Sequence, residues 1–194
     1  MPSPLIDWTA FRAFVEEFKG ESDRAAVILG AAKLDSLLAQ ILDRFLLASL
    51  ASTDELLEGD APLATFSARI NASYRLGLIS SEFAKSLHLV RRIRNAFAHE
   101  TSGCSLSTGA HSDRLKALLL PLRSLPFFLK FRERHFDEVT PSTDFRACLA
   151  MMAARLEARL NATRPVSTDQ VWTFPKKSWA DEEVTKADEP TDAT

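Results

Sequence analysis

The sequence predicts an all-α protein, a bundle of about five to seven helices. Apolar residues recur at helical spacing, no segment alternates as a strand would, and the 194 residues include only 6 glycines and 1 tyrosine. That composition disfavours β-sandwiches, P-loop enzymes and dinucleotide-binding folds. We expect one domain over residues 1–162, followed by a tail over residues 163–194 that is acidic, lacks periodicity and is expected to be disordered.

The N-terminal part of the chain contains the strongest periodic signal. A first helix is expected between Asp7, a candidate N-cap, and Gly20. Apolar residues then form a wide stripe over residues 22–50. A helix of about 29 residues would be about 43 Å long, and it would form the spine of the domain. Residues 51–60 are polar and acidic, so a loop is expected there.

Helix start and stop signals divide the rest of the chain. Pro62 fits the first turn of a helix that ends at about residue 76, before Gly77. Ser80 or Ser81 then caps a helix that ends at about residue 99. Residues 101–109 read as a loop. A further helix is expected from Ser112 or Asp113, interrupted by Pro121 and Pro126, and a last helix from Ser142.

Charge and cysteine content exclude several classes of protein. There are 24 basic and 26 acidic residues, so the net charge of −2 gives no global attraction to nucleic acid. Two cysteines, Cys104 and Cys148, cannot form a disulfide scaffold or a four-cysteine zinc site, so a reducing cytoplasm is the expected location. We expect no secretory leader, no membrane span, no metal and no cofactor.

Two side chains outside the expected helices are given no function from the sequence. Cys104 is interpreted as incidental, and His111 is expected in a loop.

The helix expected over residues 83–99 carries four basic residues and no acid. At about 100° per residue, its apolar residues, Phe83, Val90, Ile93 and Phe97, share one face. The opposite face presents His88, Arg92, Asn95 and His99, with Arg91 lying between the two faces. We therefore name His88, Arg91 and Arg92 as candidate binding residues. A basic stripe is also typical of an ordinary solvent-facing surface, and basic residues complement the dipole at a helix C-terminus.

Arg94, Asn95 and His99 are candidate catalytic residues for metal-independent RNA cleavage. The imidazole of His99 could move a proton during attack by a 2′-hydroxyl, and Arg94 could stabilise the pentavalent phosphate, with Asn95 orienting either group. On a straight helix, however, Arg94 points about 140° away from His99. The two side chains could therefore meet at one phosphate only if the helix end unwinds or a second subunit completes the site.

A helix-turn-helix over residues 68–89 is disfavoured by its own composition. A recognition helix reads bases mainly through its N-terminal residues. Here these residues are Ser80, Ser81 and Glu82, and the carboxylate of Glu82 would face phosphate unfavourably. The arginines come about three turns later.

Two segments of the chain resemble the bacterial mannitol operon repressor family. They are residues 56–70, which read Leu-Leu-Glu-Gly-Asp-Ala-Pro-Leu-Ala-Thr-Phe-Ser-Ala-Arg-Ile, and residues 74–79, which read Tyr-Arg-Leu-Gly-Leu-Ile. Residues 21–24 and 93–99 are similar to the flanks of that family, so the resemblance covers about residues 21–100. It implies an all-helical transcription regulator that lacks a recognisable DNA-binding motif and acts through partners.

The chain also resembles the wider group of HEPN domains, which are helical bundles that usually dimerise. Their ribonuclease members carry an Arg, a polar residue and, after a few others, a His near a helix end. Arg94, Asn95 and His99 match that pattern position by position. This second resemblance implies a metal-independent endoribonuclease, such as a toxin or defence effector, although many relatives have lost activity and serve as binding modules.

Three functional hypotheses follow. The first is a cytoplasmic repressor of the mannitol type that works through protein contacts. The second is a HEPN-type ribonuclease, and the third is a nucleic-acid-binding module without catalysis, with RNA as a possible partner. In each case we expect a homodimer, because the stripe over residues 22–50 and the apolar segment 118–131 offer more apolar surface than a domain of this size easily buries.

Overall fold

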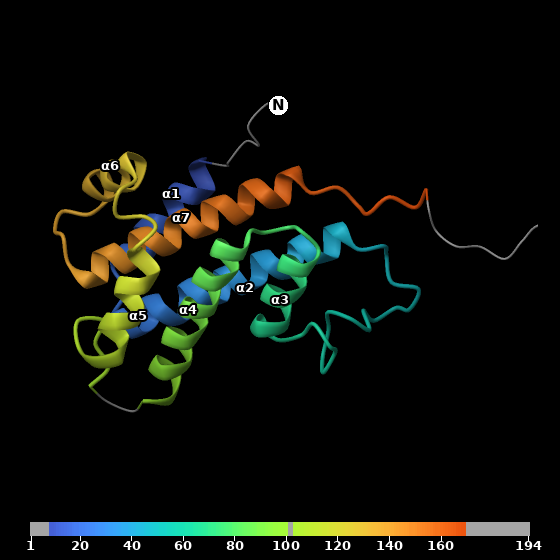
Figure 1. Cartoon of the computed structure of the whole chain (residues 1–194), viewed down its shortest axis with the longest axis horizontal. Coiled ribbons are helices and arrows are strands. Elements are labelled where there is room, and N and C mark those ends of the chain that lie inside the picture. The colour runs from blue at the N-terminus through green and yellow to red at the C-terminus, as the bar shows by residue number, and fades with distance from the viewer. Residues whose placement is uncertain (1–7, 101–102, 170–194) are drawn as a thin grey trace, which may run out of the picture.

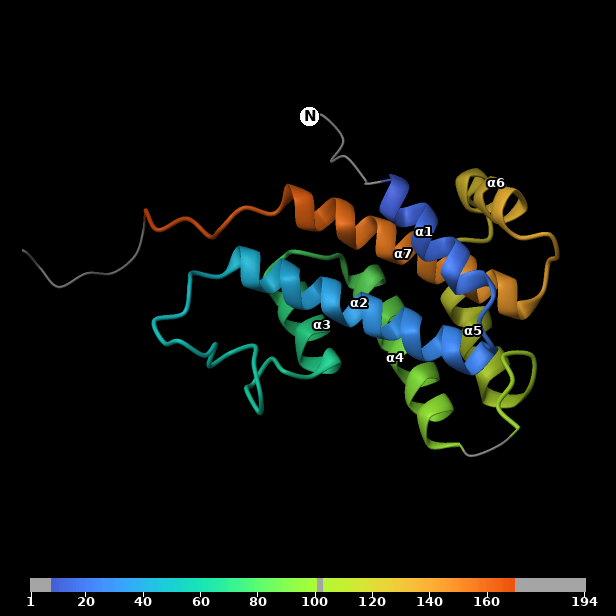
Figure 2. The same ribbon diagram turned by 180° about the vertical axis from the view of Figure 1, so that it is seen from behind.

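The computed structural model describes residues 8–100 and 103–169, and this part of the chain is entirely helical apart from turns and loops (Figures 1 and 2). The predicted all-α fold class is confirmed. The described helices are α1 (Trp8–Lys19), α2 (Asp23–Phe45), α3 (Phe66–Arg75), α4 (Ser81–His99), α5 (Gly109–Leu119), α6 (Pro126–His135) and α7 (Pro141–Ala162).

The two longest helices, α2 and α7, lie side by side and run in the same direction (Figures 1 and 2). Contacts at three levels show this arrangement. Asp23 at the start of α2 binds Arg146 near the start of α7, with 3.0 Å between Oδ1 and Nη1. Further along, Lys33 pairs with Glu157 at 3.0 Å. Near the C-terminal ends, Arg44 Nη1 donates to the carbonyl oxygen of Leu160 at 2.9 Å.

The core is built around α2, which contacts α1, α3, α4 and α7. The remaining helices cover α7 or α4: α6 packs on α7, and α5 packs on both. Apolar side chains at helical spacing from these elements share one interior. Its largest fully buried members are Phe18, Leu34, Leu38, Ile41, Leu42, Ile70, Leu87, Ile93, Phe97, Leu106, Phe128 and Phe145.

By length and composition alone, α2 is apolar enough to cross a membrane. No membrane span was expected from the sequence because it has no uninterrupted apolar run of about 18 residues. In α2, Lys33 and Asp35 interrupt the apolar run. Within the bundle both charges are paired, Lys33 with Glu157 and Asp35 with Arg69. Nine residues of α2 are buried against other helices. This is the environment of a central core helix.

Two helix boundaries in the first half differ from the expected ones. α2 ends at Phe45 rather than at residue 50, since the backbone of Leu46 is extended and the next residues turn away as a loop. α3 begins at Phe66 rather than at Pro62, because the hydroxyl of Thr65 accepts the N–H of Ala68 and forms the cap. The expected spine is therefore shorter, with 23 residues.

In the second half of the chain, the structure corrects the expected position of His111. α5 begins at Gly109, with Thr108 as N-cap, so His111 lies in the first turn of a helix and is buried rather than in a loop. The expected interruption is confirmed, because α5 ends at Leu119 and α6 begins with Pro126 in its first turn. α7 begins at Pro141 instead of Ser142.

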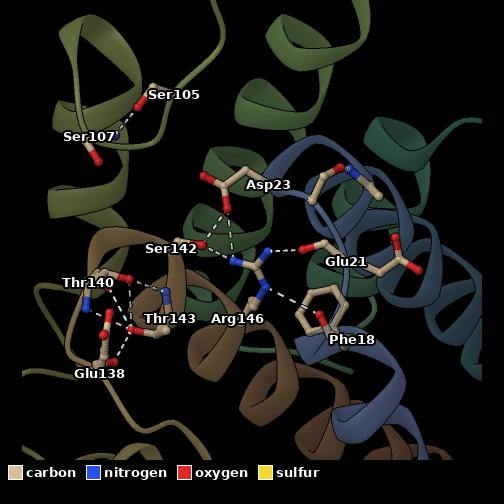
Figure 3. A network of polar contacts seen from close by, with 12 residues as sticks. Phe18, Glu21, Asp23, Ser105, Ser107, Glu138, Thr140, Ser142, Thr143 and Arg146 are labelled. Carbon is tan, nitrogen blue, oxygen red and sulfur yellow. Dashed lines mark hydrogen bonds and ion pairs between the residues drawn. The ribbon is translucent and has the colours of Figure 1, made fainter.

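A capping box explains the start of α7. The Thr140 side chain accepts the N–H of Thr143, and the Thr143 hydroxyl accepts the N–H of Thr140 (Figure 3). α7 then runs to Ala162, where the expected domain ends. The next residues remain in contact with the body, since Thr163 is buried and donates its hydroxyl hydrogen to Arg159 O at 2.8 Å. The tail was expected to be disordered over residues 163–194, and residues 170–194 of it lie outside the described residues.

Arg146 ties the first turn of α7 to the α1–α2 connection (Figure 3). Its guanidinium donates to the carbonyl oxygens of Phe18 at 3.4 Å and Glu21 at 2.6 Å, as well as to Asp23 and Ser142. The side chain is almost completely buried. Four partners on this one cation fix the angle at which α1 enters α2 and place α7 beside both.

Candidate functional site

Helix α4 carries every residue that the sequence analysis selected for function. The predicted core face is confirmed, with Val90, Ile93 and Phe97 fully buried and Phe83 partly buried. The opposite face lies toward solvent, with Arg92 and His99 exposed and His88 and Asn95 half-buried. α4 therefore presents a polar, basic surface from a helix that is held rigidly by α2, α3 and α5.

The N-terminus of α4 is occupied by its own capping interactions. Ser80 Oγ accepts the N–H of Phe83 at 3.2 Å, and Ser81 Oγ donates to Glu82 Oε1 at 3.0 Å. The pKa of Glu82 is lowered, first by a hydrogen bond from its own backbone N–H and then by the hydroxyls of Ser81 and Ser80. The carboxylate of Glu82 therefore lies in the first turn of α4, the part of a recognition helix that contacts DNA bases. This position argues against sequence-specific DNA binding by α4.

His88 connects α4 to α3. Its Nε2 lies 3.0 Å from Oδ1 of Asn71, which the neutral ring can reach as a donor. The pKa of His88 is lowered from 6.5, chiefly because the ring is partly buried and secondarily because Arg91 and Arg92 repel a further positive charge. The ring is therefore neutral at pH 7 and serves to fix the α3–α4 contact.

The two candidate arginines at binding positions differ in their surroundings. Arg92 is exposed, whereas Arg91 is half-buried, with an Nε atom that is buried and has no hydrogen-bond partner in the described part of the chain. Neither forms an ion pair with another described residue. Arg92, with the exposed Lys85 two turns earlier, thus leaves positive charge available to a partner.

The structure brings together two of the three candidate catalytic residues. Arg94 Nη1 donates to Asn95 Oδ1 at 3.0 Å. α4 remains α-helical up to His99, and the N–H of Glu100 still donates to Ala96 O at 2.9 Å. Since five residues on an intact helix correspond to about 140° of rotation and about 7.5 Å of rise, Arg94 and His99 leave the helix in different directions. One chain alone does not converge them on a single phosphate.

Arg94 instead borders a shallow hollow of about 340 Å³ between α2, α3 and α4. Here Arg69 Nη1 pairs with Asp35 Oδ1 at 2.9 Å, and Arg69 Nε is buried without a hydrogen-bond partner among the described residues. The remaining lining residues are the small Ala31, Ala32, Ser36 and Ala39 of α2 and the large aromatic Phe66 of α3.

A cluster that the sequence analysis missed lies at the C-terminal end of α4. Glu100 Oε2 accepts a hydrogen bond from Cys104 Sγ at 3.0 Å, and Glu100 Oε1 lies 3.1 Å from His111 Nε2. Arg24 of α2 donates to the Glu100 carbonyl oxygen. The His111 ring also packs edge-on against Phe97, with 5.1 Å between the centroids. These contacts join α2, the end of α4, the loop that follows and α5, and no local spacing in the sequence indicates them.

The chemistry of this cluster is that of a structural contact. The pKa of Glu100 is lowered, first by the hydrogen bond from Cys104 and then by His111. The pKa of Cys104 is raised, first by that same hydrogen bond and then by burial. Cys104 is therefore a thiol at neutral pH and a poor nucleophile. No group of His, Cys, Asp and Glu within residues 8–100 and 103–169 is arranged to hold a metal ion.

Comparison with known proteins identifies a structural neighbour. The fold is similar to that of a chain in the X-ray structure of the MtlR–HPr complex from Escherichia coli. The superposition has a TM-score of 0.55 and covers 78% of this chain and 99% of that chain, at 19% sequence identity. No family model and no curated protein matches the sequence. The helical fold implied by the resemblance to the mannitol operon repressor family is thereby confirmed.

Proposed function

We propose that this chain is a cytoplasmic transcription regulator of the mannitol operon repressor type that acts by binding other proteins. The observation that carries the proposal is the likeness of fold over 99% of a chain that was crystallised with HPr. We infer that an HPr-type protein is the partner of this chain as well. The proposed contact on this chain is the basic surface of α4, where Arg92 is exposed.

Two features of α4 support protein contacts over the alternatives. Its N-terminal side chains form caps, and Glu82 there opposes the approach of phosphate, which disfavours direct reading of DNA. Its intact C-terminal turn keeps Arg94 away from His99, which disfavours RNA cleavage by one chain. What remains is a rigid, basic helical face. Such a surface steers an acidic partner and fixes its orientation.

We also propose that the chain forms a homodimer, through a smaller apolar surface than the stripe over residues 22–50 and segment 118–131 that the sequence indicated. Most apolar residues of the expected stripe on α2 are buried inside the chain, as are Phe128 and Phe131 of α6. The apolar side chains that stay exposed around α5 and α6 are Leu120, Leu125 and Phe127. This corner is the proposed contact between two copies.

Isothermal titration of the full-length protein with HPr tests the proposal. The wild type should bind, and Arg92→Glu should weaken binding about tenfold or more by reversing a charge at the interface. Lys130→Glu on α6 is the matched control, because it reverses another exposed cation that lies away from α4, and it should bind as the wild type does. Absence of binding by the wild type, or equal weakening by both variants, would contradict the proposed site.

A second assay separates regulation from catalysis. Purified protein incubated with mixed RNA in EDTA should leave the RNA intact, at any protein concentration. Cleavage that disappears in His99→Ala and in Arg94→Ala, while both variants keep their fold by circular dichroism, would overturn the regulator proposal in favour of a ribonuclease completed by a second subunit.

A further inference from the structure

The loop that follows α2 surrounds a second hollow, of about 370 Å³, which we call the leucine hollow. Three of its leucines are strongly exposed: Leu47 and Leu56 keep 54% and 46% of their surface exposed, and Leu50 is fully exposed. Leucines at this exposure are costly unless something covers them. The side chains that define the hollow are Asp43, Leu47, Leu50, Asp54, Glu55 and Leu56.

The leucine hollow is negatively charged. Asp43, Asp54 and Glu55 line it, and none of its lining residues is basic. The neighbouring Arg44 does not offset these charges at the hollow, since its guanidinium is directed to the carbonyl oxygen of Leu160 at 2.9 Å. An occupant that combines apolar side chains with positive charge would complement both properties.

The chain that leaves α7 passes the edge of the leucine hollow. The N–H of Val166 donates to the carbonyl oxygen of Phe45 at 2.8 Å, and Phe45 directly precedes the lining residue Leu46. Because an extended chain covers about 3.3–3.6 Å per residue, the four residues after Val166 can reach about 13 Å from this contact at the edge of the hollow.

The sequence that follows the described residues has the required chemistry. Residues 171–179 read Val-Trp-Thr-Phe-Pro-Lys-Lys-Ser-Trp, with three aromatic side chains, two lysines and no acid. Residues 180–194 differ sharply, since they contain six acidic residues and one lysine. We propose that residues 171–179 dock in the leucine hollow of the same chain, with the aromatic side chains on the leucines and the lysines against Asp43, Asp54 and Glu55. This inference is independent of the proposed function.

Limited trypsin digestion of the full-length protein, followed by mass spectrometry, tests the docking. Cleavage after Lys176 and Lys177 requires the segment to leave the hollow, so it should be about tenfold slower in the wild type than in Leu50→Asp. Leu50 is fully exposed, so its replacement should leave the fold intact, which circular dichroism checks. Cleavage after Lys186, beyond the docking segment, should be equally fast in both proteins and serves as the internal standard.

The matched control is Leu29→Asp, another exposed leucine, in the N-terminal half of α2 and outside the leucine hollow. It should retain the protection seen in the wild type. Docking within one chain also predicts that protection survives about hundredfold dilution, because its effective concentration does not depend on the protein concentration. Protection lost on dilution would overturn the proposal in favour of a second copy as occupant. Equal cleavage in the wild type and Leu50→Asp would overturn it outright.

Discussion

Gly30 of α2 faces Leu149 of α7 so closely that a Cβ atom on the glycine would overlap the leucine Cδ1, and it would also lie 3.0 Å from Cζ of Phe18. The hydrogen atom of a glycine is thus what allows α1, α2 and α7 to meet at one point. Glycine in the middle of a helix costs about 1 kcal/mol relative to alanine. Here that cost is offset by the close approach of the two longest helices.

Gly30→Ala should therefore destabilise the protein although it raises helix propensity. Overpacking of this kind costs about 1–3 kcal/mol, and the gain in propensity offsets up to about 1 kcal/mol of it. We expect a net loss of about 1–2 kcal/mol in the free energy of unfolding, measured by urea denaturation. Gly20→Ala is the control, because nothing lies within 4 Å of its added Cβ. Equal stability of Gly30→Ala and the wild type would contradict the packing described.

Arg146→Met should be among the most destabilising single substitutions on α7. It removes the donor for two backbone carbonyls and for Asp23, while Asp23 remains in place. Breaking a buried ion pair by removing one partner costs about 3–5 kcal/mol, and the partial exposure of Asp23 should bring the loss to the lower end of this range. The control Lys116→Met breaks the exposed pair with Asp113 and should cost under about 1 kcal/mol in the same urea titration.

The ring of His88 should titrate below 6.5 in the folded protein. Its lowered pKa means that the folded state favours the neutral ring over the charged one. The stability that the neutral ring contributes is therefore fully present above the pKa of the unfolded chain, and it is lost as the pH falls through the pKa of the folded protein. NMR titration of the ring protons measures the midpoint directly. Arg92→Gln should raise it only part of the way to 6.5, since burial is the larger cause. A midpoint at or above that of the urea-unfolded chain would be inconsistent with the structure.

Cys104 should react slowly with iodoacetamide at pH 7.5, and Glu100→Gln should accelerate the reaction several-fold. The carboxylate of Glu100 is the largest cause of the raised thiol pKa, so its neutralisation releases more thiolate. Cys148 is the internal reference, because complete burial raises its pKa to about 12 and it should stay unmodified until the protein unfolds. Mass spectrometry of the labelled peptides separates the two sites. An unchanged rate for Cys104 in Glu100→Gln would refute the hydrogen bond.

The features that were predictable from sequence depend on local spacing. The core face of α4, the interruption between α5 and α6, and the divergence of Arg94 from His99 all follow from residues within a few helical turns of one another. The C-terminus of α2 was less predictable. Residues 46–50 continue the apolar composition of the helix, and the change to an extended backbone at Leu46 depends on the loop that follows.

The contacts that escaped prediction join distant parts of the chain. Arg24 and Glu100 are 76 residues apart, and Arg146 and Asp23 are 123 residues apart. An exposed basic residue and a buried one look alike in a sequence, so only the folded chain distinguishes Arg92, which faces solvent, from Arg146, which holds three elements together.

The pairing of α2 with α7 sets the order in which this protein can acquire its structure during synthesis. Of the described helices, α7 emerges from the ribosome last, and it begins 96 residues after the end of α2, the helix with which it makes the most extensive contact. Until then the face of α2 that α7 covers is exposed on the nascent chain, and α2 is long and apolar enough to enter a membrane. The chain should therefore depend on chaperones during translation, and premature termination before α7 should yield aggregates instead of a smaller stable domain.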